Sequence, residues 1–376
     1  MNSCDMRCTM VVDLDTIAWN MNELRRRAGG LRLLAVQKAN AYGLGVGGVA
    51  PLLRDNGAAF FGAATLPEAL ELLPFGLPVM MLGGPFPGEI PAAVEAGIIL
   101  PAAGLELAQM IDREAARQRR KAVVQIKIDS GMGRLGMIAE EAVEEIVRIA
   151  GLEHLDVTGI YSHFSSATEV DHPYCRLQKE RFLNLLAQLR ERGIVFRNIH
   201  MCASNGIACM PECCQPPFNL IRGGLGMYGY CDIPGMERPL RPVVTIKSGL
   251  VGVRRLKRGS CIGYNRTCTL THDSLVGTVA MGYANGLPVT AGPDAAMLVH
   301  GVRCPVIGRV SMDYCTVLLD EVPEARIGDE VVCVGKQGEA VVTLSEWAAA
   351  RGTHEHETLC AFGMRTARKY IHGSIC

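Results

Sequence analysis

Polar side chains that could do chemistry recur just after short apolar segments in the first 225 residues. They are Lys38, Lys127, Asp129, Arg134, His163, Ser204, Arg222 and the pair Gly223-Gly224. A lysine can supply an amine for a Schiff base, and a glycine pair lets backbone N–H groups approach phosphate oxygens. Singly, a lysine here is usually a solvated surface residue and a histidine usually a core residue. Together they predict a site for a small anionic ligand such as a phosphate ester.

The elements that must position these residues are read from an alternation of apolar and amphipathic stretches. The apolar segments, predicted as strands, are 31–36, 58–62, 77–82, 97–100, 122–129, 157–163, 198–202 and 218–222. Predicted helices are 16–27, with Asp15 as its N-cap, and 66–73, 105–117, 140–150 and 174–192. Eight such alternations predict a (β/α)8 barrel, with an open doubly wound sheet as the alternative. In such barrels reactive groups follow the C-terminal ends of the strands, where the polar residues stand.

The pattern changes after about residue 239 to short strands separated by turns. The predicted strands are 243–247, 250–254, 274–280, 296–300, 302–307, 315–319 and 330–334, with one clear helix at 344–351. The Pro- and Gly-containing stretch 232–242 is the predicted linker. We therefore expect an α/β barrel domain over residues 9–236 and a mainly β domain over residues 237–376.

Composition excludes several classes of protein. The 38 basic and 38 acidic residues balance, which argues against a nucleic-acid or anionic-membrane partner. No apolar stretch reaches the roughly 18 residues of a spanning helix, and the first ten residues lack the apolar core of a secretory signal. A cytoplasmic protein is expected. The 15 cysteines are odd in number and dispersed through a long chain, so they are predicted to be reduced and mostly buried.

Several segments resemble motifs of the alanine racemase family, whose fold-type III members use pyridoxal 5′-phosphate. These are residues 35–43 (AVQKANAYG), 127–136 (KIDSGMGRLG), 282–286 (GYANG) and 308–313 (GRVSMD). Two further stretches, 13–15 (DLD) and 64–70 (ATLPEAL), also resemble the family. The resemblance extends over essentially the whole chain.

The resemblance implies a two-base racemase. Lys38 would carry the cofactor and act as one base, and Tyr283 of the partner subunit would act on the opposite face of Cα. Arg222 would face the pyridine nitrogen, supported by His163. The implied cofactor ligands are Lys38, Tyr42, His163, Ser204, Arg222, Gly224, Leu225 and His356.

The substrate carboxylate would be bound by Arg134 and, through its backbone N–H, by Met312. Lys127 is the candidate carbamylated lysine that holds Arg134, because a carbamate attracts a guanidinium that an ammonium would repel. These roles imply a homodimer with active sites shared between subunits.

The implied activity is interconversion of L-alanine and D-alanine, supplying D-alanine for peptidoglycan. His356 stands where the family usually has tyrosine, so a racemase that prefers serine or another small amino acid is an alternative. A non-catalytic pyridoxal phosphate carrier on the same barrel would lack the second domain. A fold-type III decarboxylase of basic amino acids would lack the GYANG tyrosine.

Overall fold

The computed structural model describes residues 7–231 and 239–373, which divide into two compact units. The barrel unit contains residues 17–39, 49–231 and 239–241, and the β unit contains residues 7–16, 40–48 and 242–373. The predicted boundary between residues 236 and 237 lies outside the described residues. The predicted barrel range includes residues 9–16 and 40–48, which belong to the β unit.

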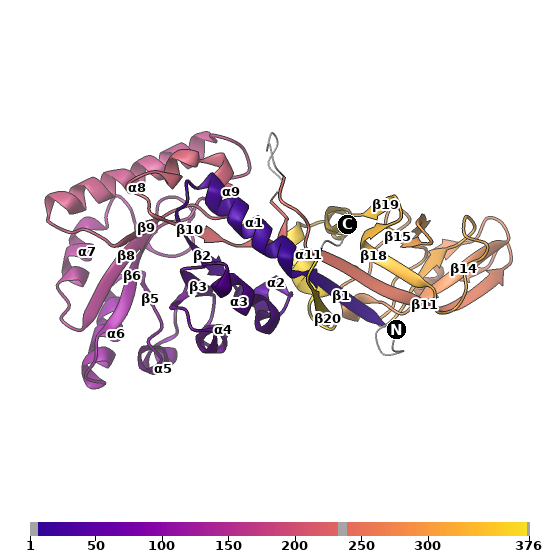
Figure 1. The fold of residues 1–376 in the computed structure, drawn as a ribbon, viewed down its shortest axis with the longest axis horizontal. Coiled ribbons are helices and arrows are strands. Elements are labelled where there is room, and N and C mark those ends of the chain that lie inside the picture. Colours follow the sequence, from indigo (N-terminus) through magenta and orange to yellow (C-terminus); the bar gives the residue numbers. More distant parts are fainter. Residues whose placement is uncertain (1–6, 232–238, 374–376) are drawn as a thin grey trace. The chain divides into compact units, whose positions relative to one another are not determined.

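Eight parallel strands, counted over residues 17–231, form the barrel (Figure 1). They are β2 (Arg32–Val36), β3 (Phe60–Ala63), β4 (Val79–Met81), β5 (Leu100–Ala102), β6 (Ala122–Asp129), β8 (Leu155–Tyr161), β9 (Asn198–His200) and β10 (Leu220–Gly223). They pair in the orders β10-β2-β3-β4 and β5-β6-β8-β9, with the short β7 (Met137–Ile138) on β6. A parallel bridge between Met80 and Ile99 joins the two sets on one side, and the Asn219 N–H donates to Ile199 O at 3.0 Å on the other. The predicted (β/α)8 barrel is confirmed.

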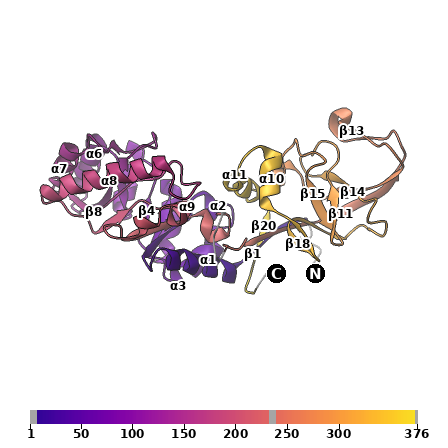
Figure 2. The same ribbon diagram turned by 90° about the horizontal axis from the view of Figure 1, so that it is seen from above.

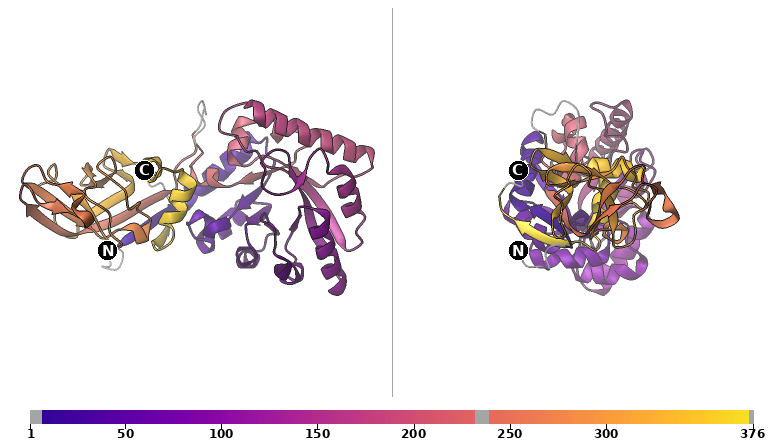
Figure 3. Two further views of the ribbon diagram at one scale, coloured as in Figure 1. Left: turned by 180° about the vertical axis from the view of Figure 1, so that it is seen from behind. Right: turned by 90° about the vertical axis from the view of Figure 1, so that its right-hand side faces the viewer.

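Helices cover the outside of this barrel, and the long α8 is easily followed in Figure 3. The helices are α1 (Leu14–Arg27), α3 (Val46–Asp55), α4 (Leu66–Leu72), α5 (Ile90–Glu95), α6 (Leu105–Arg117), α7 (Val143–Ala150), α8 (Pro173–Glu191) and α9 (Ser204–Cys209). In α6 the buried residues Ala108, Ile111 and Ala115 recur at helical spacing, so one face packs inward. The predicted cap of α1 is wrong. Asp13, not Asp15, accepts the Thr16 N–H at 3.0 Å, because the helix begins at Leu14.

The β unit is built on a sheet that runs β16-β15-β18-β11-β1-β20 in the described residues, with β14, β17 and β19 attached at its side. Its strands are β1 (Cys8–Asp13), β11 (Val244–Leu256), β14 (Ser274–Val279), β15 (Ala296–Val299), β16 (Val302–Pro305), β17 (Cys315–Leu318), β18 (Glu330–Gln337), β19 (Ala340–Val342) and β20 (Ala367–Ile371). A separate hairpin joins β12 (Cys261–Ile262) to β13 (Cys268–Thr269). Helices α10 (Leu344–Arg351) and α11 (Glu355–Phe362) lie side by side (Figure 2). A mainly β second unit was predicted, and the structure contains one.

Three details differ from the prediction for this unit. The expected strands 243–247 and 250–254 are one strand, β11, whose pairing shifts register near Leu250 and Gly252. A second helix, α11, follows the expected one. The first strand of the chain, β1, pairs with β11 and β20.

No helix among the described residues is long and apolar enough to cross a membrane. Most of the described cysteines are buried, as predicted.

Candidate active site

The predicted site residues fall into two groups, one in each unit. The barrel unit holds Lys38, Lys127, Arg134, His163, Ser204, Arg222, Gly224 and Leu225, all at or just after the C-terminal ends of strands. The β unit holds Tyr42, Tyr283, Met312 and His356.

Lys38 is an exposed residue that directly follows β2. Its neighbour Gln37 is fully buried, and the Gln37 side-chain amide donates to Val36 O at 3.0 Å and to the Tyr228 hydroxyl at 2.8 Å. After Lys38 the backbone makes a left-handed turn, α2 (Lys38–Tyr42), in which Ala39 to Tyr42 have φ between 51° and 55°. The left-handed conformation costs an L-residue roughly 1–2 kcal/mol. Such strain is typical of functional sites.

Arg222, on β10, is the centre of a buried hydrogen-bond network. One terminal nitrogen lies 2.7 Å from His200 Nδ1. The other donates to Ser162 O and Met201 O, both at 2.8 Å, and lies 2.9 Å from His163 Nδ1. Its side chain is only 4% exposed. The predicted pair of Arg222 and His163 is therefore in direct contact.

The two histidines around Arg222 must be neutral. A guanidinium can only donate, so both Nδ1 atoms accept, and the remaining proton of His200 sits on Nε2, which lies 2.8 Å from Gln125 Oε1. Burial, with Arg222 next, lowers the pKa of His163 to about 2 and that of His200 well below its usual value. Burial lowers the pKa of Arg222 only to about 10, so the arginine keeps its charge at neutral pH.

Tyr161, Gln125 and His200 were not among the predicted site residues. The Tyr161 ring stacks on His200 at 4.9 Å, and both Arg222 and Lys127 lie over its face. The Tyr161 hydroxyl and Gln125 Nε2 are buried and lack a hydrogen-bond partner within the described part of the chain. Unsatisfied buried polar atoms call for an explanation such as a bound group.

Lys127 lies on β6 and is only 6% exposed. Its ammonium or amine donates to Ile128 O at 2.8 Å. Burial, followed by the charge of Arg222, lowers the pKa of Lys127 from 10.5 to about 7. The lowered pKa favours the uncharged amine, the form that carbamylation by CO₂ requires.

Asp129 shapes the loop that carries Arg134. Its carboxylate accepts the N–H groups of Gly131 at 2.8 Å, Met132 at 2.7 Å and Arg134 at 3.0 Å. Burial raises the pKa of Asp129, but these hydrogen bonds outweigh burial and the net pKa is lowered. Arg134 itself is exposed, and its charge contributes to the lowered pKa of Lys127.

Ser204 and the glycines after β10 form a tight cradle. The Ser204 hydroxyl oxygen accepts the N–H of Gly224 at 3.0 Å and of Gly226 at 3.1 Å. A Cβ on Gly226 would lie 2.9 Å from Ser204 Cβ, so only glycine permits this approach. Leu225 begins the short helix η5 (Leu225–Tyr228) within the same turn.

In the β unit, Tyr283 and Met312 lie on segments that are bonded together. Tyr283 N–H donates to Ser311 O at 3.0 Å and Ala284 N–H to Met312 O at 3.1 Å. A Cβ on Gly282 would lie 2.3 Å from Met312 O, which requires glycine in the GYANG segment. The Tyr283 side chain is 40% exposed and that of Met312 is 53% exposed.

A second tyrosine of the β unit, Tyr264, has features of a functional residue and was not predicted. It is 68% exposed and stands between residues of positive φ, namely Gly263 at 71° and Asn265 at 60°. A Cβ on Gly263 would lie 2.8 Å from Arg309 N, so the turn packs on the segment that leads to Met312. The Gly-Tyr-Asn sequence of a tight turn was the signal that could have identified it.

Tyr42 and His356 meet in the β unit, with ring centroids 6.1 Å apart. His354 lies next to them, 5.3 Å from the His356 ring in an edge arrangement. Tyr42 is buried and His356 is exposed. His356, at the position where the resemblance led us to expect tyrosine, therefore lies beside Tyr42.

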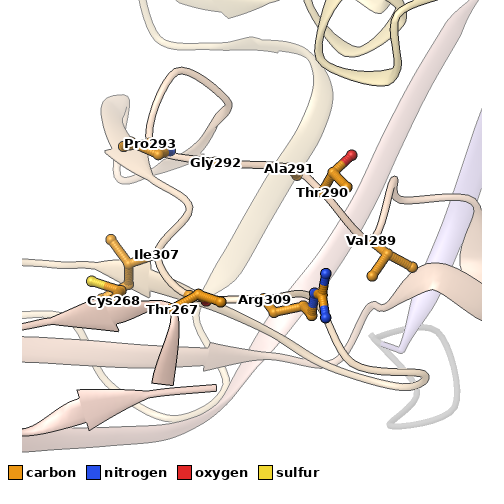
Figure 4. A pocket seen from close by; sticks show the side chains of 10 residues that line it. Thr267, Cys268, Val289, Thr290, Ala291, Gly292, Pro293, Ile307 and Arg309 are labelled. Atoms are coloured by element: carbon orange, nitrogen blue, oxygen red, sulfur yellow. The ribbon is translucent and has the colours of Figure 1, made fainter. Parts of the chain in front are cut away.

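A cavity of about 390 Å³ also opens in the β unit (Figure 4). It is lined by Thr267, Cys268, Val289, Thr290, Ala291, Gly292, Pro293, Ile307, Gly308 and Arg309. None of the predicted site residues lines it, although Arg309 touches the turn that carries Tyr264.

Comparison with known proteins gives matches over nearly the whole chain. Residues 12–232 match the sequence model of the alanine racemase N-terminal domain, and residues 243–370 match that of the C-terminal domain.

The alanine racemase of Symbiobacterium thermophilum is 34% identical over 363 residues, covering 96% of both chains. The structure of the Clostridium difficile 630 alanine racemase has a TM-score of 0.91 at 30% identity, covering 99% of this chain and 97% of that one. An alanine racemase structure from Bartonella henselae, with covalently bound pyridoxal phosphate, has a TM-score of 0.87 at 25% identity, covering 97% and 99%. The resemblance inferred from sequence is confirmed, and the chain belongs to the alanine racemase family.

Proposed function

We propose that this protein is a pyridoxal phosphate-dependent racemase that interconverts L-alanine and D-alanine. Relatives named alanine racemase match it over 96% of its length. The observation that carries the proposal is the charged, buried Arg222 between two neutral histidines at one end of the barrel.

The residues of the barrel unit fit pyridoxal phosphate. Ser204, whose oxygen already accepts the Gly224 N–H, offers its hydroxyl proton to a phosphate, and Leu225 offers the backbone N–H at the start of η5. The Tyr161 hydroxyl and Gln125 Nε2, which have no hydrogen-bond partner among the described residues, are buried polar atoms beside Arg222 and His200. Lys38 supplies the amine that would hold the cofactor. When bound, the cofactor supplies an electron-withdrawing ring that makes the α-proton of an amino acid acidic.

Arg222 would hold the ring nitrogen without protonating it. Its pKa of about 10 is far above that of a pyridine, and the neutral His163 and His200 turn unprotonated Nδ1 atoms toward it. A full positive charge on the ring is therefore disfavoured. Limited electron withdrawal suits racemisation, in which the proton must return to Cα without side reactions.

Racemisation needs one base on each face of Cα. Lys38, in its neutral amine form, takes or returns the proton on one face. A tyrosine of the β unit, contributed by the partner subunit of a homodimer, acts on the other face. Tyr283 is the tyrosine predicted from the sequence. Tyr264 is the stronger candidate for the second base. Its side chain is 68% exposed, against 40% for Tyr283, and it lies in a turn with left-handed backbone.

Arg134 and the Met312 N–H would bind the substrate carboxylate. Arg134 lies on the loop that Asp129 fixes, and its charge acts on Lys127. A carbamate on Lys127 would place a negative charge beside this guanidinium and hold it toward the substrate. The lowered pKa of Lys127 supports that modification.

We further propose that the enzyme is cytoplasmic and that it supplies D-alanine for peptidoglycan. The non-catalytic carrier is excluded, because residues 243–370 match the C-terminal racemase domain. A preference for serine remains the second candidate, favoured by the smaller, exposed His356 beside Tyr42.

A racemase assay over small L-amino acids tests this function. Purified enzyme with pyridoxal phosphate should form the D-enantiomer of alanine, detected by D-amino acid oxidase. A higher kcat/KM for serine than for alanine would select the second candidate. Absence of racemisation of any small amino acid would refute both.

A further inference from the structure

We propose that Glu68 is a positioning residue for Lys38, an inference that rests on the proposed racemase function. Glu68 lies on α4, and its carboxylate accepts two backbone N–H groups. Oε1 accepts from Ala39 at 2.8 Å, and Oε2 accepts from Ala64 at 2.8 Å. One side chain therefore ties the residue after Lys38 to the residue after β3.

The chain on the other side of Lys38 is already fixed. Gln37 N–H donates to Gly62 O at 2.7 Å, and the Gln37 side chain is held by Val36 and Tyr228. The backbone before Lys38 is thus held in place by hydrogen bonds to the strands of the barrel. On the side after Lys38, the Glu68 carboxylate provides the matching attachment.

The hydrogen bond from Ala39 to Glu68 is made where the backbone conformation is unfavourable for an L-residue. Ala39 is the first residue of the left-handed turn, with φ of 51°, and it is exposed. Asn40 is the next residue of the turn, and its Oδ1 accepts the N–H of Val46, which lies beyond the far end of the turn, at 2.8 Å. Glu68 holds the start. An ionised carboxylate forms stronger hydrogen bonds than a neutral group does, which suits a site open to water.

The position of Ala39 matters because the Lys38 amine must reach one face of Cα. Displacement of a reacting group by about 1 Å can cost about 100-fold in rate. We expect kcat to fall about 10- to 100-fold when Glu68 is removed, with KM changed much less. The effect should be confined to the base that Glu68 positions.

Two variants and a matched control test this inference. Glu68→Ala removes both acceptors, and Glu68→Gln keeps the shape but leaves one acceptor oxygen for two N–H groups. Glu71→Ala changes an exposed glutamate on the same helix. All three are first compared in the cofactor-free protein by hydrogen–deuterium exchange of the peptide that contains Ala39. Exchange should be at least about tenfold faster in Glu68→Ala, intermediate in Glu68→Gln, and unchanged in Glu71→Ala.

The second readout uses the loaded enzyme and α-deuterated L- and D-alanine. Lys38 removes the α-deuteron from only one enantiomer. In the Glu68 variants the primary isotope effect should rise for that enantiomer and not for the other. A smaller folded fraction would lower both rates and change neither isotope effect.

Unchanged exchange at Ala39, or faster exchange with unaltered isotope effects, would overturn the positioning role. A wild-type enzyme that racemises nothing would instead overturn the proposed function. In that case the exchange experiment would still report whether Glu68 holds the turn.

Discussion

The cradle around Ser204 makes a sharp prediction, because it depends on a glycine with no room for a side chain. In Gly226→Ala the new Cβ would lie 2.9 Å from Ser204 Cβ and 3.0 Å from Ser204 Oγ. Carbon atoms pack at about 3.5–4.0 Å. The turn after β10 and the start of α9 must therefore move apart by roughly 0.5–1 Å.

That movement breaks the hydrogen bonds that shape the cradle. The Ser204 oxygen lies 3.0 Å from Gly224 N and 3.1 Å from Gly226 N. The same separation would lengthen both distances beyond hydrogen-bond range. A neutral hydrogen bond contributes about 0.5–1.5 kcal/mol, so restoring the two-bond geometry when the cofactor binds would cost about 1–3 kcal/mol. The Kd for pyridoxal phosphate should rise about 5- to 150-fold.

Titration of cofactor-free protein with pyridoxal phosphate, followed by absorbance, measures this Kd. Gly88→Ala is the control, since a Cβ there meets nothing within 4 Å. Ser204→Ala removes the oxygen without a clash and should weaken binding as well. A Gly226→Ala variant that binds the cofactor like wild type would refute the assignment of this turn to the phosphate.

Three further predictions concern the other site residues. In CO₂-free buffer, Lys127→Met should stabilise the cofactor-free protein at pH 7 by up to about 4 kcal/mol. The pKa of Lys127 is about 7 in the folded protein and 10.5 when unfolded, so unfolding takes up a proton and the native lysine favours the unfolded state at this pH. Chemical denaturation should show this gain shrinking toward pH 10.5, and a constant gain would contradict the lowered pKa. Either Tyr264→Phe or Tyr283→Phe should remove the second base. That variant should nearly abolish α-proton exchange from one enantiomer of alanine, measured by NMR in D₂O, while the other enantiomer still exchanges. An equal loss of exchange for both enantiomers would contradict the two-base scheme. His356→Tyr should lower the ratio of kcat/KM for serine to that for alanine, and an unchanged ratio would remove His356 as a determinant of specificity.

The barrel could be predicted from the sequence because its strands are local apolar segments. Each predicted segment contains or overlaps one of the observed parallel strands. What could not be predicted is pairing between distant parts of the chain. The strand β1 pairs with β11 and β20, more than 200 residues away. Helix α11 (EHETLCAF) lacks a strong apolar periodicity, so it was missed.

The site was predictable where a residue type and its place at a strand end coincide, as for Lys38 and Arg222. The partners of Arg222 were harder to foresee. His200 and Gln125 lie on different strands, and only the closed barrel brings them together. Glu68 lies in the segment 64–70 that resembles the family. Its hydrogen bonds to Ala39 and Ala64 could not be predicted, because the one to Ala39 depends on the left-handed turn after Lys38.

The central claim is that Lys38 and pyridoxal phosphate together racemise alanine. Proton NMR of L-alanine in D₂O with the loaded enzyme measures it directly, with D-alanine determined in the same sample. Wild type should exchange the α-proton and form D-alanine until the enantiomers are equal, and Lys38→Ala should do neither. A wild-type enzyme that leaves L-alanine unchanged, or a Lys38→Ala variant that racemises at the wild-type rate, would contradict the account.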